Sequence, residues 1–261
     1  SGANSEASAR TVSMSLSVEE TRALLSEVPK AYNTQINDVL LAALVQVLAH
    51  WTQSTHVRFN LEGHGREEIW DNANVSRTVG WFTTIFPVVL HHATDNPGEA
   101  LKSIKEQLRR IPSQGMSYGW LRYLLDDAET TAQLTNQGSA QVVFNHLGQF
   151  DSVQKTSALF QLTDESSGLS RSPLNHRSHL LEVNSIIIGA QLHVNWTYSE
   201  NLHRHSTIEG LAQEYLQALR ELIAHCLAPD AGAYTPTDFP AAGLSQTDLD
   251  ELFAQLEEVE S

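Results

Sequence analysis

The sequence predicts an α/β fold in which a mixed β-sheet is packed with helices, and three patterns support this. Residues 56–62 alternate apolar and polar side chains, the period of a half-buried strand. Residues 33–51 and 206–226 carry apolar side chains at three- and four-residue spacing, which is typical of packed helices. Two strand-like runs, 180–188 and 190–198, flank Gly189 and predict a hairpin.

Composition limits the class of protein and its partners. With 261 residues, 41% of them hydrophobic, the chain is long enough for one large domain or two small ones. The formal charge of −15 argues against a nucleic-acid partner. No apolar run approaches the ~20 residues that span a membrane, and no signal peptide opens the sequence. The single Cys226 excludes an intramolecular disulfide, so we expect a buried thiol and a cytoplasmic protein.

The first elements are a strand, a short helix and a long helix. Residues 1–10 are small, polar and without pattern, as in a linker or a remnant of cloning. Residues 11–16 alternate as a strand does, and Ser17-Val-Glu-Glu20 forms a capping box for a short helix. The long helix of residues 33–51 follows, with Asn37 and Asp38 as polar exceptions near its start.

A carboxylate ends the strand of residues 56–62. Because the apolar residues of this strand face the core, Glu62 points the other way. The glycines at 63 and 65 permit an abrupt turn that keeps His64 and Arg66 near the carboxylate. From spacing alone, a plain surface turn and a functional site are equally good interpretations.

Residues 75–90 predict a loop followed by a buried strand, because apolar residues are too dense there for a solvent-facing strand. Asn96 begins a helix whose far end is basic, with Arg109 and Arg110. This end is either a docking site for an acidic partner or, as we favour, a solvated helix face.

The second half predicts a strand, the hairpin and further helices. After a glycine-punctuated loop at 112–119 and a short helix at 120–125, residues 141–145 form a strand that runs into polar residues at 146–151. Such strand ends often carry chemistry in α/β proteins. The remaining segments are a loop at 152–178, a final helix capped by Ser206, an extended linker at 235–240 and a short acidic helix at 245–259.

Several chemistries lack their motifs. Twelve histidines suggest a metal, but no His-Glu-x-x-His, Cys-x-x-Cys or comparable ligand set occurs, and we expect no metal site. There is no phosphate-cradling glycine loop and no Gly-x-Ser-x-Gly turn, so nucleotide hydrolysis and serine esterase chemistry have no support.

Four motifs occur in order: Glu62-Gly-His-Gly-Arg66, Ser76-Arg-Thr-Val-Gly-Trp-Phe-Thr83, Pro112-x-x-Gly-x-x-Tyr-Gly119 and Phe144-Asn-His-Leu-Gly-Gln-Phe-Asp151. Together they resemble the epimerization domains of nonribosomal peptide synthetases. Residues 32–41 and the linker at 235–240 extend the similarity over nearly the whole chain. Related condensation domains share the fold, but the residues of the second and fourth motifs are similar to those of the epimerizing branch.

The resemblance implies a lobe like chloramphenicol acetyltransferase, one of two that form a V around a tunnel. This chain looks like the C-terminal lobe at residues 11–229, followed by a linker and short helix at 230–261. The family's other lobe carries a His-His-x-x-x-Asp-Gly motif that is absent here. The pair His91-His92 has the wrong spacing to Asp95, and we do not expect it to be catalytic.

The implied reaction is inversion at Cα of an aminoacyl or peptidyl thioester held on the phosphopantetheine arm of a carrier protein, with no cofactor bound directly. Inversion removes the Cα proton from one face and returns it to the other, so two proton-handling groups are natural. By resemblance Glu62 is one and the absent His the other, and a water-poor tunnel raises the pKa of a glutamate. Arg66 either orients Glu62 or opposes that shift.

The resemblance also assigns expectations to other residues. Asn145 matches the family's Asn and hydrogen-bonds the thioester or the enolate, whereas His146 stands where the family usually has Tyr. For Arg77, Gly80 and Trp81, tunnel lining and loop packing are equally good interpretations. Tyr118 is a candidate for substrate binding, although it and Gly115 are better explained as structural.

We therefore expect the lobe alone to be inactive, and to work with a carrier protein and the missing N-terminal lobe. Its exposed lobe interface is expected to favour self-association. Two alternatives stay open: a lobe of a condensation domain that forms peptide bonds, and a non-catalytic module that docks carrier proteins.

Overall fold

In the computed structural model, one six-stranded sheet organises the chain, and the structure describes residues 2–66, 74–150, 165 and 168–260. The strands are β1 (Ala9–Ser15), β2 (His56–Gly63), β3 (Thr84–His91), β4 (Val142–Gln149), β5 (Leu181–Ile188) and β6 (Gln191–Ser199). They lie in the order β1-β6-β5-β4-β2-β3. Strand β4 runs parallel to both β2 and β5, and the other pairs are antiparallel. The predicted mixed sheet is thus confirmed.

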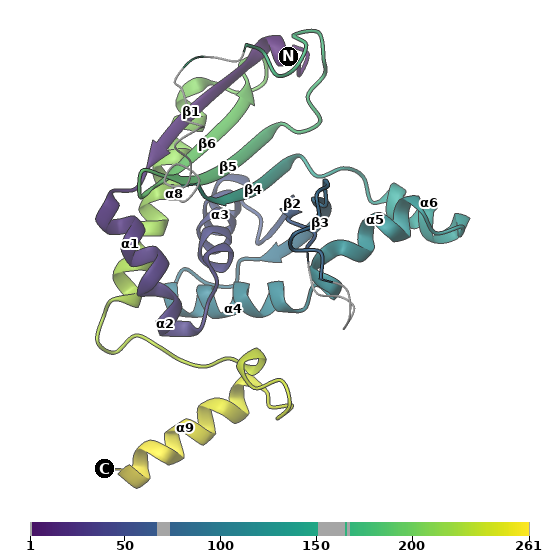
Figure 1. The fold of residues 1–261 in the computed structure, drawn as a ribbon. Helices are drawn as coiled ribbons and strands as arrows, with labels where there is room; N and C mark the ends of the chain where they lie inside the picture. Colours follow the sequence, from purple (N-terminus) through teal and green to yellow (C-terminus); the bar gives the residue numbers. More distant parts are fainter. Residues whose placement is uncertain (1, 67–73, 151–164, 166–167, 261) are drawn as a thin grey trace.

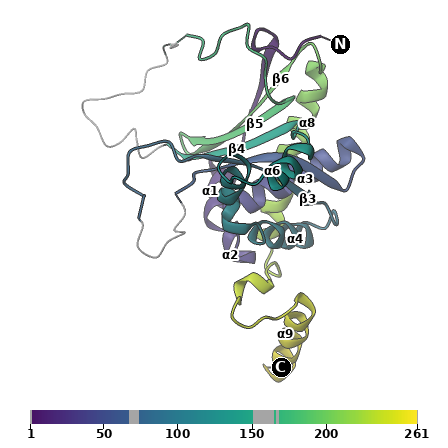
Figure 2. The ribbon, with the colours of Figure 1, turned by 90° about the vertical axis from the view of Figure 1, so that its right-hand side faces the viewer.

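The α-helices are α1 (Val18–Ser26), α2 (Val28–Tyr32), α3 (Ile36–Thr52), α4 (Pro97–Arg109), α5 (Met116–Tyr123), α6 (Ala128–Asn136), α8 (His205–Cys226) and α9 (Gln246–Glu260). Short 3-10 turns lie at Glu6–Ser8, Pro112–Gly115 and Pro236–Asp238. Helices α3 and α8 pack together against the sheet, and α9 lies away from the sheet in both views (Figures 1 and 2). Among the described helices, none combines the length and apolar character that crossing a bilayer requires.

Alternation along the strands gives the sheet two unlike faces. On one face, which we call the core face, apolar side chains such as Phe59, Phe144 and Trp196 are fully buried beneath the helices. The side chains between them, such as Asn60, Asn145 and Asn195, are only partly buried and form what we call the open face. Most polar groups of the strands thus gather on one surface, as the period-2 pattern requires.

Several predicted elements are confirmed in detail. The capping box is present, because Ser17 accepts from the backbone N–H of Glu20 and the Glu20 carboxylate accepts from that of Ser17. The Asn96 side chain caps α4. The hairpin joins β5 to β6 at Gly189, and α9 occupies most of the acidic segment predicted as a helix. Both long helices are present at the predicted places.

Both predicted linkers pack against the lobe. Ala9 and Arg10 already pair with β6, and the Asn4 amide donates to the backbone carbonyls of Arg177 and His179. At the other end, the Asp238 carboxylate lies 2.7 Å from the Lys105 Nζ atom, and both side chains are almost fully buried. Residues 1–10 were expected to stand outside the fold, and from residue 4 onward this is wrong because polar side chains bind distant backbone.

Three local predictions differ from the structure, and one helix was not predicted. Strand β3 is an edge strand whose side chains alternate between buried and exposed, where a buried strand was expected. Much of the loop expected at 112–119 is helical, because α5 begins at Met116. Ser206 does not cap α8, which starts at His205 after the extended backbone of Arg204. Helix α6 was not predicted. Most of the loop expected at 152–178 lies outside the described residues.

The edge position of β3 explains its proline. The backbone N–H of His91 donates to the Gln107 side chain, so it points away from β2, and alternation turns position 87 the same way. Pro87 has no N–H and therefore removes a donor from the free edge without costing a bond to β2. An apolar run in an edge strand is tolerated for this reason.

Candidate functional site

The structure brings Glu62 and Asn145 together. Strands β2 and β4 run parallel with Leu61 opposite Phe144, so the next residues, Glu62 and Asn145, lie side by side on the open face. The Asn145 side-chain N–H donates to Glu62 Oε2 over 2.8 Å. Both side chains are partly buried. A carboxylate and an amide from strands far apart in the sequence thus form one polar unit.

This unit ends a row of polar side chains that crosses the open face. In register with Asn145 lie Asn184 on β5, Asn195 on β6 and Ser13 on β1. The Ser13 hydroxyl donates to Asn195 Oδ1 over 2.7 Å. Three adjacent amides leading to a carboxylate provide hydrogen-bond donors and acceptors for a polar chain laid across the sheet.

The electrostatic surroundings raise the pKa of Glu62 above its ordinary value. Burial of the carboxyl group is the largest cause, the nearby Glu182 carboxylate adds to it, and the Arg171 guanidinium opposes it. Glu182 is itself held by Arg177, with an N–O distance of 3.0 Å. The sequence analysis missed Glu182 and Arg171. Alternation along residues 181–188 would have placed Glu182 on the open face, whereas Arg171 lies in a loop without a pattern.

Arg66 does not contact Glu62. Its guanidinium donates to the backbone carbonyls of Val75, Thr78 and Gly80, and it lies over the Phe82 ring, 4.3 Å from the centroid. Of the two alternatives for Arg66, orienting Glu62 has no supporting contact among the described residues, because loop carbonyls bind the guanidinium instead. Arg66 instead fixes the loop that carries the second motif.

His146 lies on the opposite face of β4 from Asn145. Its Nδ1 atom is 2.9 Å from the hydroxyl of Ser185, a fully buried residue of the core face. Burial lowers the pKa of His146, so the neutral imidazole is favoured near pH 7. The structure thus separates His146 from Glu62, because β4 continues to Gln149 and alternation turns the side chain inward.

The other candidate residues make no contact with Glu62 among the described interactions. Arg77, Gly80 and Trp81 are exposed, and the Trp81 side chain is 90% exposed. Tyr118 packs against the core, and its hydroxyl accepts a hydrogen bond from Arg122 over 2.6 Å. Gly115 has φ of +83°, and a Cβ there would lie 2.2 Å from the Phe86 ring, so this glycine is required by packing.

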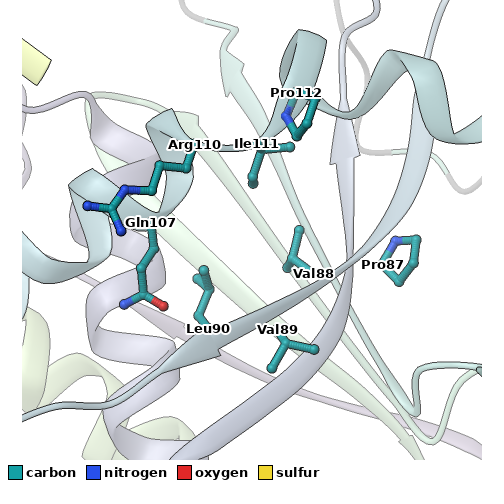
Figure 3. Close-up of a pocket in the computed structure, with 8 residues that line it drawn as sticks. All are labelled: Pro87, Val88, Val89, Leu90, Gln107, Arg110, Ile111 and Pro112. Carbon is teal, nitrogen blue, oxygen red and sulfur yellow. The ribbon is translucent and has the colours of Figure 1, made fainter. Parts of the chain in front are cut away.

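An open pocket lies at β3 (Figure 3), and neither Glu62 nor Asn145 is among the residues that line it. Strand β3 and the end of α4 with the turn after it supply its lining, which consists of Pro87, Val88, Val89, Leu90, Gln107, Arg110, Ile111 and Pro112. The candidate site is therefore an open polar surface and not this pocket.

Comparisons with known proteins agree on one family. A family model described as a condensation domain matches residues 1–244. A linear gramicidin synthase of Brevibacillus parabrevis is 49% identical over 259 residues, which are 99% of this chain and 3% of that protein. Gramicidin S synthase 1 of Brevibacillus brevis is 38% identical over 259 residues, 96% of this chain and 23% of that protein. The chain thus spans a small part of the curated relatives it matches.

Solved structures give the same result for the fold. The epimerization domain from the third module of tyrocidine synthetase B is 37% identical, with a TM-score of 0.79 over 87% of this chain and 50% of that one. A four-domain nonribosomal peptide synthetase that is 13% identical, with a TM-score of 0.62, supports the fold alone. From the extent of the family match and the shared mixed sheet, we conclude that this chain belongs to the condensation-domain family.

Proposed function

We propose that this chain is the C-terminal half of an epimerization domain and contributes to L-to-D inversion at Cα of a carrier-bound aminoacyl or peptidyl thioester. The observation that carries the proposal is the Glu62–Asn145 unit, in which a partly buried carboxyl group of raised pKa accepts a hydrogen bond from an amide. The likeness to a tyrocidine synthetase epimerization domain supports the same reaction.

In the proposed mechanism, Glu62 handles the Cα proton. The thioester carbonyl acidifies this proton, so a carboxylate accepts it while the electron pair of the C–H bond moves into an enolate. Delivery of a proton to the other face then gives the inverted centre. A carboxyl group of raised pKa suits both directions, because proton transfer is most efficient when the pKa of the catalyst lies near the working pH.

The second proton-handling group is proposed to come from another lobe. The His-His-x-x-x-Asp-Gly motif of the family does not occur in these 261 residues, and this chain covers half of the matched epimerization domain. Within this chain, Asn145 is placed to hold the Glu62 carboxylate in one orientation. The isolated chain is therefore expected to be inactive, and a phosphopantetheine arm of a carrier domain is proposed to present the substrate.

Exposed apolar side chains mark where a second lobe or a carrier domain is proposed to pack. Ile85 lies opposite Glu62 on β3 and is 46% exposed, and Val79 in the loop held by Arg66 is fully exposed. The same surface supports the expectation that the isolated chain self-associates. Size-exclusion chromatography over a range of concentrations tests this, and a monomer throughout would count against it.

Exchange of the Cα proton with solvent deuterium tests the proposed reaction. The chain is joined to an N-terminal lobe of an epimerization domain and given a carrier-bound aminoacyl thioester. Glu62→Gln is expected to abolish the exchange, and Glu200→Gln, which removes an exposed carboxylate paired with Arg10, is the matched control. Exchange that survives Glu62→Gln would refute the role of this carboxylate.

The family description itself supports a second candidate, a condensation domain that forms peptide bonds. The two reactions separate in one assay, because condensation needs an acceptor amine on a second carrier and inversion does not. Peptide formation without Cα exchange would favour condensation. Carrier binding with neither reaction would favour a non-catalytic docking module.

A further inference from the structure

Two histidines and an aspartate converge at the end of the sheet opposite to Glu62. His50 lies in the last turn of α3, while His92 and Asp95 lie between β3 and α4. Asp95 Oδ1 is 2.9 Å from His50 Nε2 and 3.0 Å from His92 Nε2. One ligand atom from each of the three side chains lies within 4.8 Å of the ligand atoms of the other two. Six residues of β2 separate this cluster from Glu62, a distance of about 20 Å.

The backbone holds each of the three residues in place. His50 is inside a helix whose end is fixed by Gln53, which donates to the His50 carbonyl from both backbone and side chain. The N–H of His92 donates to the Thr55 carbonyl over 2.7 Å, and the His92 side chain is 11% exposed. Asp95 directly precedes Asn96, the cap of α4. The backbone of the cluster is therefore fixed by hydrogen bonds and helix ends, and the His92 side chain is also largely buried.

The donor set is one that Zn²⁺ uses in proteins. Imidazole nitrogens and a carboxylate oxygen bind Zn²⁺ at about 2.0–2.2 Å, which separates neighbouring ligands of a tetrahedral ion by about 3.3 Å. The two Asp95–His distances are shorter than this by only a few tenths of an ångström. Small side-chain movements would thus admit the ion, and the carboxylate lowers the charge of the complex from +2 to +1.

We propose that His50, His92 and Asp95 form a Zn²⁺ site that joins the end of α3 to the connection between β3 and α4. Three protein ligands leave a fourth tetrahedral position, and the exposure of His50 and Asp95 opens that position to water. The expectation from sequence of no metal site rested on local motifs, and these ligands come from two distant segments. The proposal does not depend on the proposed function of Glu62.

Zn²⁺ titration of the chelator-treated 261-residue chain, followed by calorimetry, tests the site. We expect one site of highest affinity, with little response to Mg²⁺ because the donors include two imidazoles. His50→Ala, His92→Ala and Asp95→Ala are each expected to weaken that site by at least about tenfold. His91→Ala is the matched control, since it removes an adjacent histidine whose ring packs on His56 outside the cluster.

Two further measurements distinguish a specific Zn²⁺ site from nonspecific binding of metal to the twelve histidines. Co²⁺ in the same site should give the strong visible absorption of a tetrahedral complex, and Asp95→Asn should reduce it while circular dichroism shows an unchanged fold. Zn²⁺ should raise the melting temperature of the wild type more than that of the Asp95→Asn variant. Equal affinities for the wild type and the three cluster variants, or an equal loss in His91→Ala, would overturn the proposal.

Discussion

The ion pair between Arg109 and Asp38 gives the most specific prediction for stability. Both guanidinium nitrogens contact the carboxylate, with Nη1–Oδ1 at 2.9 Å and Nη2–Oδ2 at 2.7 Å. The Asp38 side chain is 1% exposed and that of Arg109 is 28% exposed. The pair joins the start of α3 to the end of α4. At the basic end of α4, Arg109 therefore binds a side chain of the same fold.

Arg109→Met should destabilise the fold because it leaves a buried carboxylate without its cation. Removing one partner of a buried ion pair costs about 3–5 kcal/mol. Asp38 retains the hydrogen bond from the Gln35 backbone N–H and the favourable dipole at the helix start, worth up to about 1 kcal/mol. We therefore expect the free energy of unfolding in water to fall by about 2–4 kcal/mol.

Urea unfolding followed by circular dichroism measures this loss, with an unchanged m value as the sign that the folded state is otherwise intact. Arg110→Met is the matched control, because Arg110 is exposed and an exposed charge contributes about 0–1 kcal/mol. The double variant Asp38→Asn/Arg109→Met removes both charges and should recover part of the loss. If Arg109→Met costs no more than Arg110→Met, the buried pair does not stabilise the fold as argued.

Three further predictions concern packing and the candidate site. Gly115→Ala should lower the free energy of unfolding by about 3 kcal/mol, because the new Cβ would meet the Phe86 ring at a residue of positive φ. Gly119→Ala has free space around its Cβ and should stabilise α5 by about 0.5–1 kcal/mol. Urea unfolding of the two variants compares these effects. The pKa of Glu62 is raised in the folded state, so ionisation of this carboxyl group destabilises the fold. Glu62→Gln should therefore increase the free energy of unfolding at pH 7. This gain should vanish below the unfolded pKa of about 4.3, where the carboxyl group is protonated in both states. Stability curves from pH 3 to 8 check this, and a gain that persists at low pH would contradict it. Asn145→Leu removes the N–H group that donates to the Glu62 carboxylate, so it should raise the pKa of Glu62 further. NMR titration of the Glu62 carboxyl carbon measures this pKa. A lower pKa in the variant would contradict the stabilising hydrogen bond.

The placement of single side chains on a strand is the part of the site that sequence predicts well. Alternation alone puts Glu62 opposite to Leu61, and the structure has Leu61 buried on the core face and Glu62 on the open face. The same rule, continued past Asn145, would have turned His146 toward the core. The orientation of His146 was not predicted, because the strand was expected to end at residue 145, whereas β4 runs to Gln149.

The meeting of Glu62 with Asn145 was not predictable from spacing. It depends on β2 lying beside β4, a parallel pairing of strands that are separated in the sequence by β3 and three α-helices. Arg66 shows the same limit at shorter range, because its partners are carbonyl groups of a loop whose path no local pattern gives. Contacts of this kind are set by tertiary packing, which overrides local preference.

The two influences on Glu62 fit a group that both accepts and returns a proton. Burial and Glu182 favour the neutral carboxylic acid, while Arg171 and the N–H of Asn145 favour the carboxylate. A carboxyl group affected only by burial and a neighbouring carboxylate would keep its proton. A carboxylate affected only by a guanidinium and an N–H donor would not accept one. A carboxyl group of raised pKa that had no chemical role would only lower the stability of the fold at neutral pH, and this consideration supports the proposed role of Glu62 in proton transfer.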